Sequence, residues 1–171
     1  MAGLERAMRT LDAISVWSAR LTGWLILPLT FILGYEVVSR KFFHRPTTWA
    51  SDMSYMLYGA LFMMGAAYAL QRGAHIRTDF LYRLWPARVQ GVIDAVLYLV
   101  FFFPGIALFL WLGWDFAWAS WQQGERAITS PWRAPIYLLK AVIPVAAALL
   151  FLQGVSEFLK SLYAAFRGRW P

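Results

Sequence analysis

The side chains in this sequence that could carry out chemistry are few, and they stand at the ends of long apolar runs. Among 171 residues there are nine acidic residues, two histidines and no cysteine. The acidic residues closest to the apolar runs all fall near the end of one, and they are Glu36, Asp52, Asp94, Asp115 and Glu157. A transporter that works alone places ionisable groups deep in its membrane spans. The pattern therefore argues against an independent substrate pathway in this chain.

The positions of these acidic residues give them structural roles. Arg40 follows Glu36 at a spacing of i, i+4, so the two can form an ion pair on one face of a helix. Asp52 falls in the first turn expected for the next helix, where the helix dipole favours a negative charge. We therefore expect these side chains to stabilise helix ends rather than to bind an ion.

The two histidines, His44 and His75, fall in loops expected on opposite sides of a membrane. Haem held between helices needs axial ligands that face one another, so this separation argues against a small cytochrome subunit. The absence of cysteine excludes disulfides, thiolate metal sites and cysteine nucleophiles. The sequence also has no nucleotide-binding loop, catalytic triad or paired zinc-ligand motif. It therefore predicts neither an enzyme nor a cofactor or metal site in this chain.

Apolar runs long enough to cross a membrane account for most of the sequence. Hydrophobic residues make up 60% of the chain and charged residues 15%, whereas a soluble domain carries about 25% charged residues. A helix needs about 20 apolar residues to cross the hydrocarbon core. The pattern predicts an all-α integral membrane protein with a single membrane domain over residues 1–171. Its four transmembrane helices are expected at about residues 21–38, 49–70, 89–114 and 134–158.

The segments that flank the spans are expected to lie at the membrane surface. Apolar residues recur at helical spacing within residues 1–20, which predicts an amphipathic helix in the membrane interface. The apolar run after it lacks a small-residue cleavage site and is interpreted as a retained first span rather than a signal peptide. Tryptophans at the end of the third span continue past the membrane thickness, which predicts a helix that tilts or projects outward. Residues 159–171 are expected to form a basic cytoplasmic tail.

The distribution of Lys and Arg predicts the orientation. The net charge is +7, but the basic residues cluster in loops and at helix ends. That placement favours contacts with phospholipid headgroups over binding of nucleic acid. Lys and Arg are more numerous in the amino terminus, second loop and carboxyl tail than in the first and third loops. The positive-inside rule therefore places both termini in the cytoplasm.

Small residues predict faces for helix packing, because glycine and alanine let membrane helices approach closely. They gather in the second and fourth spans as Gly59, Gly65, Ala66, Ala67, Ala69, Ala146, Ala147, Ala148 and Gly154. These faces can pack on one another within the chain or on a partner, and the sequence leaves both options open. Four helices without a site of their own are best explained as part of a larger membrane assembly.

The region from residue 40 to residue 79 resembles the signature of a known family. Its features are Arg40, Phe42, Phe43, Pro46, Trp49, Asp52 and the run LFMMGAAYALQRGAHIRTD, which includes Gly65, Gly73, His75, Arg77 and Asp79. With the four spans, the aromatic third helix and the basic tail, they resemble the small membrane subunit of tripartite ATP-independent periplasmic (TRAP) transporters, the DctQ-like family. Many relatives carry a glutamate where this chain has Asp52. The shorter side chain of aspartate keeps the negative charge but places the carboxylate closer to the backbone.

The resemblance implies a function in transport. By this resemblance, the chain is expected to act as a scaffold bound to a large multi-span membrane subunit. The large subunit is expected to carry the sodium and substrate sites and to move in an elevator-like manner. A periplasmic substrate-binding protein delivers the substrate, typically an organic acid. The resemblance thus implies a sodium-coupled uptake system in the bacterial inner membrane, with no cofactor in this chain and with sodium bound by the large subunit.

The basic residues of the first loop gain an expected role from this resemblance. Arg40, Lys41 and Arg45 are more than topology requires in a loop that faces outward. We expect them to help dock an acidic surface of the binding protein.

A second motif group follows Gly73. His75, Arg77 and Asp79 are expected either to fix the cytoplasmic loop between spans two and three or to anchor it to headgroups. Three other interpretations of the whole chain stay open: a stand-alone homo-oligomeric transporter or channel, a membrane-anchor subunit of a redox complex, and an assembly factor for another membrane complex.

Overall fold

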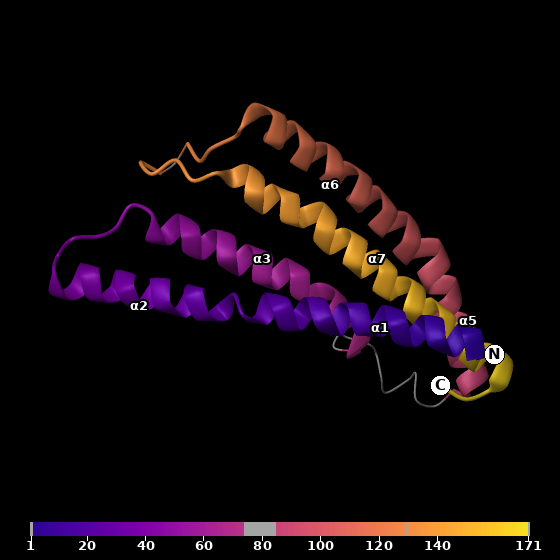
Figure 1. Cartoon of the computed structure of the whole chain (residues 1–171). Helices are drawn as coiled ribbons and strands as arrows, with labels where there is room; N and C mark the ends of the chain where they lie inside the picture. The colour runs from indigo at the N-terminus through magenta and orange to yellow at the C-terminus, as the bar shows by residue number, and fades with distance from the viewer. Residues whose placement is uncertain (1, 74–84, 129, 171) are drawn as a thin grey trace.

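The structure, a computed structural model, describes residues 2–73, 85–128 and 130–170 (Figure 1). Within these residues the chain consists of helices and connecting loops, and the only β-type pairing is an isolated bridge between Arg126 and Pro135. The helices in chain order are α1 Ala2–Gly23, α2 Ile26–Phe42, α3 Ala50–Gln71, α5 Ala87–Leu97, the π-helix η1 Tyr98–Phe102, α6 Phe103–Gln123 and α7 Ile136–Arg167.

Four helical stretches are long and apolar enough to cross a membrane. They are Gly3–Phe42, Ala50–Gln71, Ala87–Gln123 and Ile136–Arg167, and they confirm the predicted all-α fold with four spans. At a rise of 1.5 Å per residue, the 40 residues of the first stretch extend about 60 Å, twice the thickness of a hydrocarbon core. The positions of the membrane boundaries along these helices stay predictions.

The first stretch is two helices joined by a turn. The residues predicted as an amino-terminal helix form α1, which runs on to Gly23, and α2 continues from Ile26 along nearly the same line (Figure 1). The turn between them carries hydrogen bonds of the tighter i, i+3 kind, from Trp24 to Leu21 and from Leu25 to Thr22. Pro28 explains the break, because its ring clashes with the carbonyl group four residues earlier.

The third stretch is one continuous helix with a wider turn in its middle. It extends from Ala87 to Gln123 and therefore reaches beyond both ends of the predicted span, residues 89–114. In the π-helix the N–H of Phe103 donates to the carbonyl of Tyr98, five residues earlier. Pro104 stands directly after this turn, where it removes one backbone donor from the helix.

Helix α7 is longer than the sequence indicated. Residues 159–167 were expected in a basic tail, but they continue α7 as far as Arg167, and Gly168 ends the helix with a left-handed φ of 69°. The cause is tertiary packing, since this last part of α7 lies against α5. Such packing stabilises helical turns in residues whose charge and polarity alone predict a non-helical tail.

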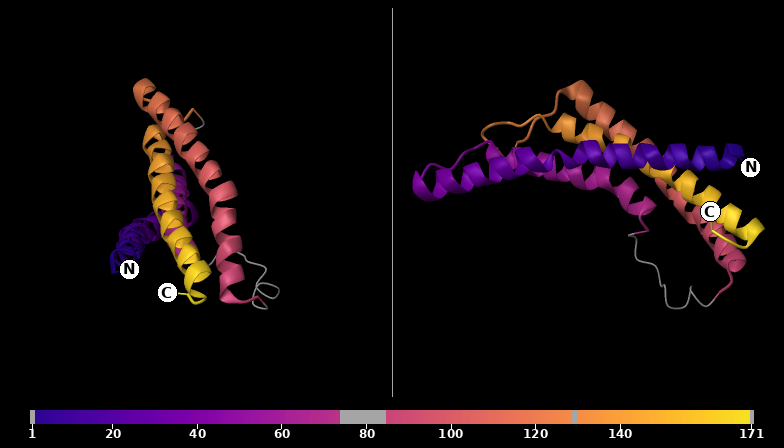
Figure 2. Two further views of the ribbon diagram at one scale, coloured as in Figure 1. Left: turned by 90° about the vertical axis from the view of Figure 1, so that its right-hand side faces the viewer. Right: turned by 60° about the horizontal axis from the view of Figure 1, so that its bottom comes forward.

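The spanning helices form an open layer rather than a closed bundle. In Figure 1 their order is α2, α3, α7 and α6, and α1 crosses the end of α7 that lies near both termini. Helix α7 packs against α1, α3, α5 and α6, whereas α2 packs against α3. Figure 2 shows that the line of α1 and α2 is inclined to α6 and α7. Helix α7 is therefore the centre of the fold.

A close approach of two helix backbones involves a glycine that the sequence analysis did not select. A Cβ atom added to Gly91 would lie 2.5 Å from the backbone oxygen of Ser161 in α7, so a side chain there would push α5 and α7 apart. Of the glycines that were selected, Gly154 lies against the ring of Phe102, whereas a Cβ at Gly65 would have no atom of another described segment within 4 Å. Gly65 is thus no packing point between the described helices.

Candidate functional site

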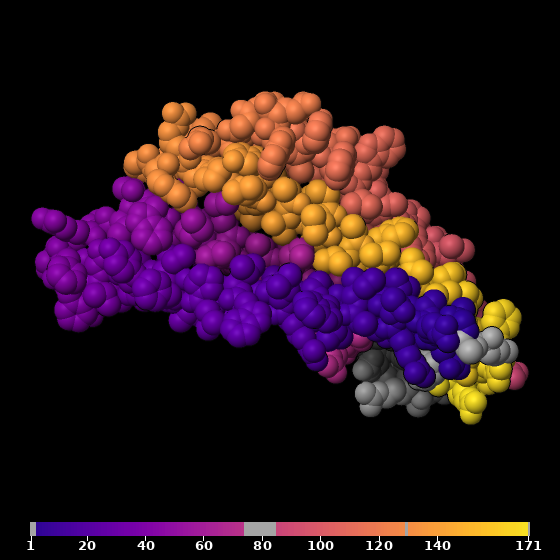
Figure 3. All heavy atoms as spheres, viewed as in Figure 1, coloured from indigo at the N-terminus to yellow at the C-terminus, as the bar shows by residue number. Residues whose placement is uncertain are grey.

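Most of the helix surface is left uncovered by the rest of the chain. In the most apolar windows of the four stretches, only 17%, 11%, 11% and 28% of residues are buried. The outer helices α2 and α6 carry large exposed side chains, including Phe31 at 74% and Trp111 at 69% exposure. Figure 3 shows α2 at the edge of the molecule, away from α6 and α7. Apolar surface of this extent marks contact with lipid or with a partner protein.

The carboxylate of Glu36 fixes the end of α2 and the loop that follows. Its Oε1 accepts a hydrogen bond from Arg40 at 2.7 Å, which confirms the predicted ion pair. Its Oε2 accepts one from the backbone N–H of Thr47 at 3.1 Å and another from the Thr47 hydroxyl. The loop is therefore folded back onto α2.

The same loop presents its remaining basic residues to the outside. Lys41 and Arg45 are exposed and form no ion pair with any described residue. His44 occupies the left-handed region with φ 52°, so the chain reverses sharply at this point. Trp49 stacks on Tyr35 of α2, with ring centroids 5.9 Å apart. The role of this loop in docking stays a prediction.

The remaining motif residues are dispersed along α3. Asp52 lies in the first turn, as predicted, and its buried Oδ2 accepts no hydrogen bond from a described residue. Gly65 faces open space in the middle of the helix. Gly73 follows the end of α3 with φ 64°, a conformation that suits glycine. The predicted loop residues His75, Arg77 and Asp79 lie outside the described residues.

A second ion pair joins the loop after α6 to α7, at the end of the molecule that carries the first loop. Glu125 accepts hydrogen bonds from Lys140 and from Ser120, the latter at 2.7 Å. These bonds hold the pKa of the Glu125 carboxyl below its usual value, and the bond from Lys140 has the larger effect. The ammonium of Lys140 also lies 4.0 Å from the ring centroid of Phe116. The turn between α6 and α7 is thereby tied down at both sides.

A polar cluster that the sequence analysis missed joins α1 to α7. We call it the α1–α7 cluster, and its members are Asp12, Ser15, Gln153, Ser156, Glu157 and Lys160. It lies near the end of the molecule that holds both termini. Three of its side chains are almost completely excluded from solvent, because Gln153 and Ser156 are 0% and Ser15 is 1% exposed.

Gln153 is the centre of the α1–α7 cluster. Its Oε1 accepts a hydrogen bond from the Ser15 hydroxyl at 2.6 Å. Its Nε2 donates to Asp12 at 2.9 Å and to Glu157 at 3.0 Å. Every polar atom of this buried amide is therefore used, as a buried polar group requires.

One lysine lies between the two carboxylates of the α1–α7 cluster and offsets part of their negative charge. The ammonium of Lys160 lies 2.9 Å from Asp12 and 2.8 Å from Glu157. Ser156 adds a hydrogen bond of 2.7 Å to Asp12. One signal was present in the sequence, because Gln153, Ser156 and Lys160 recur at helical spacing on one face of an apolar helix.

No group of three or more His, Asp or Glu side chains within the described parts of the chain comes together in a way that could hold a metal ion. Glu36 and Glu125 instead bond to groups near the ends of α2 and α6, and the α1–α7 cluster joins the middle parts of α1 and α7. The arrangement provides helix surface and well-fixed ends.

Residues 29–163 match the family described as the DctQ component of tripartite ATP-independent periplasmic transporters. The chain belongs to this family. The match extends from α2 into the last turns of α7, so it includes residues 40–79, whose motifs suggested the resemblance. Over 105 residues the chain is also 26% identical to the sialic acid TRAP transporter permease protein SiaT of Haemophilus influenzae, which covers 61% of this chain. The chain spans only 16% of the length of that relative.

Membership of the DctQ family makes this chain a TRAP transporter small subunit and a multi-pass membrane protein. The family is a transporter component rather than an enzyme family. The predicted recognition is therefore confirmed.

Proposed function

We propose that this DctQ-family chain is the scaffold of its transporter and widens the stationary part of the large subunit. The observation that carries the proposal is the open layer of helices, in which α2 and α6 expose large apolar side chains on the outside. In the ion pairs of Glu36 and Glu125 and in the α1–α7 cluster, the polar groups satisfy one another, as expected of side chains that hold helices together rather than bind a transported substrate. A scaffold needs surface and fixed ends, and this chain provides both.

The relative SiaT supports a partnership with a much larger membrane component. That protein is described as a whole permease, and the segment that matches this chain makes up 16% of it. In the present protein we propose that a separate large subunit supplies the remainder, including the substrate and sodium sites. The substrate is proposed to be an organic acid, because sialic acid, named for the relative, is one.

The location and the docking role complete the proposal. The family description names periplasmic transporters, which supports a proposed location in the bacterial inner membrane. The exposed side chains of Lys41 and Arg45 suit contact with an acidic surface of the binding protein, since charged rims accelerate and orient association.

The scaffold proposal is tested by purification of the tagged chain together with its genomic neighbours in mild detergent, followed by native mass spectrometry. We expect a complex with one much larger multi-span protein. Recovery of a homo-oligomer alone would instead support a stand-alone transporter or channel. A haem absorbance band in the purified complex would indicate a redox anchor.

The docking proposal is tested by charge reversal at the loop, with the variant K41E/R45E. We expect uptake to fall several-fold at low salt while the yield of the complex stays unchanged, because rim charges mainly affect the association rate. Arg40 is left intact, since its guanidinium holds Glu36. The matched control is R126E in the loop between α6 and α7. Normal uptake by K41E/R45E would refute the docking role.

A further inference from the structure

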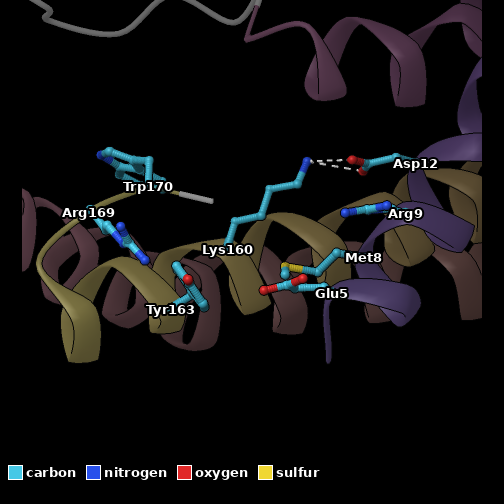
Figure 4. Close-up of a pocket in the computed structure, with 8 residues that line it drawn as sticks. All are labelled: Glu5, Met8, Arg9, Asp12, Lys160, Tyr163, Arg169 and Trp170. Atoms are coloured by element: carbon cyan, nitrogen blue, oxygen red, sulfur yellow. Dashed lines mark hydrogen bonds and ion pairs between the residues drawn. The ribbon is translucent and has the colours of Figure 1, made fainter. Parts of the chain in front are cut away.

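A pocket of about 440 Å³ lies beside the α1–α7 cluster, at the end of the molecule that holds both termini (Figure 4). Its lining comes from α1, from the last turns of α7 and from the residues that follow α7. The volume falls within the range of roughly 300–1,000 Å³ that small-molecule sites occupy. The scaffold role of the chain does not require this pocket.

Two arginines reach the pocket from different segments of the chain. In Figure 4 Arg9 enters from α1 and Arg169 from the segment after α7, on opposite sides of the space between them. Both are exposed, and neither forms an ion pair with a described residue. Lys160, by contrast, is already bonded to Asp12 and Glu157. The charges available to a ligand are therefore the two guanidinium groups.

The other groups at the pocket define what kind of anion would fit. The lining includes the carboxylate of Glu5, which accepts hydrogen bonds but repels a second negative charge. It also includes Tyr163 and Trp170, the two residue types that are enriched where a membrane meets water. Met8, only 4% exposed, gives the pocket an apolar wall. A ligand that carries one phosphate, neutral hydroxyl groups and an apolar part satisfies all these groups.

The position of the pocket indicates the source of that ligand. It lies at the ends of apolar helices that are long enough to reach past the hydrocarbon core. Further basic groups surround it, because Arg167 lies over the Tyr163 ring at 5.9 Å and Arg88 packs against Gly168. Clusters of basic residues next to membrane-spanning helices attract anionic lipids.

We propose that this pocket binds the headgroup of phosphatidylglycerol. The arginines at positions 9 and 169 hold the phosphate from two sides, and the Glu5 carboxylate accepts hydrogen bonds from the glycerol hydroxyls. The apolar wall and the two aromatic side chains contact the start of the acyl chains. The bound lipid joins α1 to the segment after α7, next to the α1–α7 cluster. This inference is independent of the scaffold proposal.

The test is a lipid titration of the purified full-length protein, with any partner that copurifies, followed by native mass spectrometry after delipidation. Phosphatidylglycerol, phosphatidylcholine and soluble glycerol phosphate are added separately. We expect phosphatidylglycerol to bind best. The variant R9Q/R169Q should bind it about twenty-five-fold more weakly, because each arginine near a membrane surface contributes about fivefold. The matched control is R20Q/R133Q, which removes two arginines elsewhere. Because Arg9 and Arg169 form no ion pair with described residues, the first variant should fold normally, and R9K/R169K should retain most of the binding.

Each outcome decides the proposal. Equal binding of phosphatidylglycerol and phosphatidylcholine would overturn it, because the pocket would then recognise no anionic glycerol headgroup. Equal binding of glycerol phosphate would also overturn it in favour of a soluble anion. If R9Q/R169Q and R20Q/R133Q lose the same amount of lipid, the effect is general surface charge and the site does not exist.

Discussion

The replacement Q153L should destabilise the protein more than its single changed side chain suggests. Leucine has nearly the shape of glutamine but removes all three hydrogen bonds that Gln153 makes across the α1–α7 cluster. The hydroxyl of Ser15, 1% exposed, loses its acceptor at a position shielded from bulk solvent. Asp12 and Glu157 lose one donor each but keep Lys160.

The loss of unfolding free energy in Q153L depends on how each hydrogen-bond partner of Gln153 is left after the replacement. The unpaired Ser15 hydroxyl costs about 1–2 kcal/mol, and the two weakened carboxylates together cost about the same. Bonds between membrane helices lie at the low end of such values, with an average near 0.6 kcal/mol. The total is about 2–4 kcal/mol, which corresponds to roughly 5–15 °C in Tm for a chain of this size.

The assay is thermal unfolding of the purified protein in detergent, followed by intrinsic fluorescence from its 10 tryptophans. The matched control is Q122L, since the exposed Gln122 near the end of α6 makes no hydrogen bond with a described residue. We expect the control to unfold within about 1 °C of the native protein, as surface changes usually do. Equal Tm values for Q153L and Q122L would refute the conclusion that the buried cluster holds α1 on α7.

Two further predictions concern the other fixed contacts. The variant G91A should lower the free energy of unfolding by about 2 kcal/mol, because the added methyl group would meet the α7 backbone. The control G65A should have no such effect. The same thermal unfolding assay compares the two variants. The ion pair of Glu125 with Lys140 should stabilise the protein at neutral pH and cease to do so as the pH falls through the lowered pKa of Glu125. The Tm difference between the native protein and E125Q should therefore be present at pH 7 and shrink toward pH 3, and a difference that stays constant would contradict the role of the ion pair.

The four spans could be predicted because they depend on local composition. About 20 consecutive apolar residues suffice to identify a spanning helix, and the Glu36–Arg40 pair follows from helical spacing alone. The ends of the helices were harder to predict from the sequence. The last turns of α7, for example, are stabilised by α5, which is distant in the sequence.

The α1–α7 cluster could not be predicted for the same reason. Its hydrogen bonds join residues up to 148 positions apart, and nothing local shows which face of α1 meets α7. Gly91 and Gly65 also look alike in the sequence, yet only Gly91 touches another helix backbone. Which glycine matters is determined by the crossing of the helices, and crossing geometry is a tertiary property.

The π-helix at Tyr98–Phe102 gives the third span one position where its length can vary. A π-turn of this kind corresponds to a single residue inserted into an α-helix. Loss of one residue elsewhere in the span would rotate everything beyond it by about 100° and turn Gly91 and Gly113 to different sides. Loss of one residue within η1 would restore ordinary α-helical bonding and leave both glycines facing α7, which they contact at Ser161 and Ile143. Natural length variants of this span should therefore be concentrated at η1.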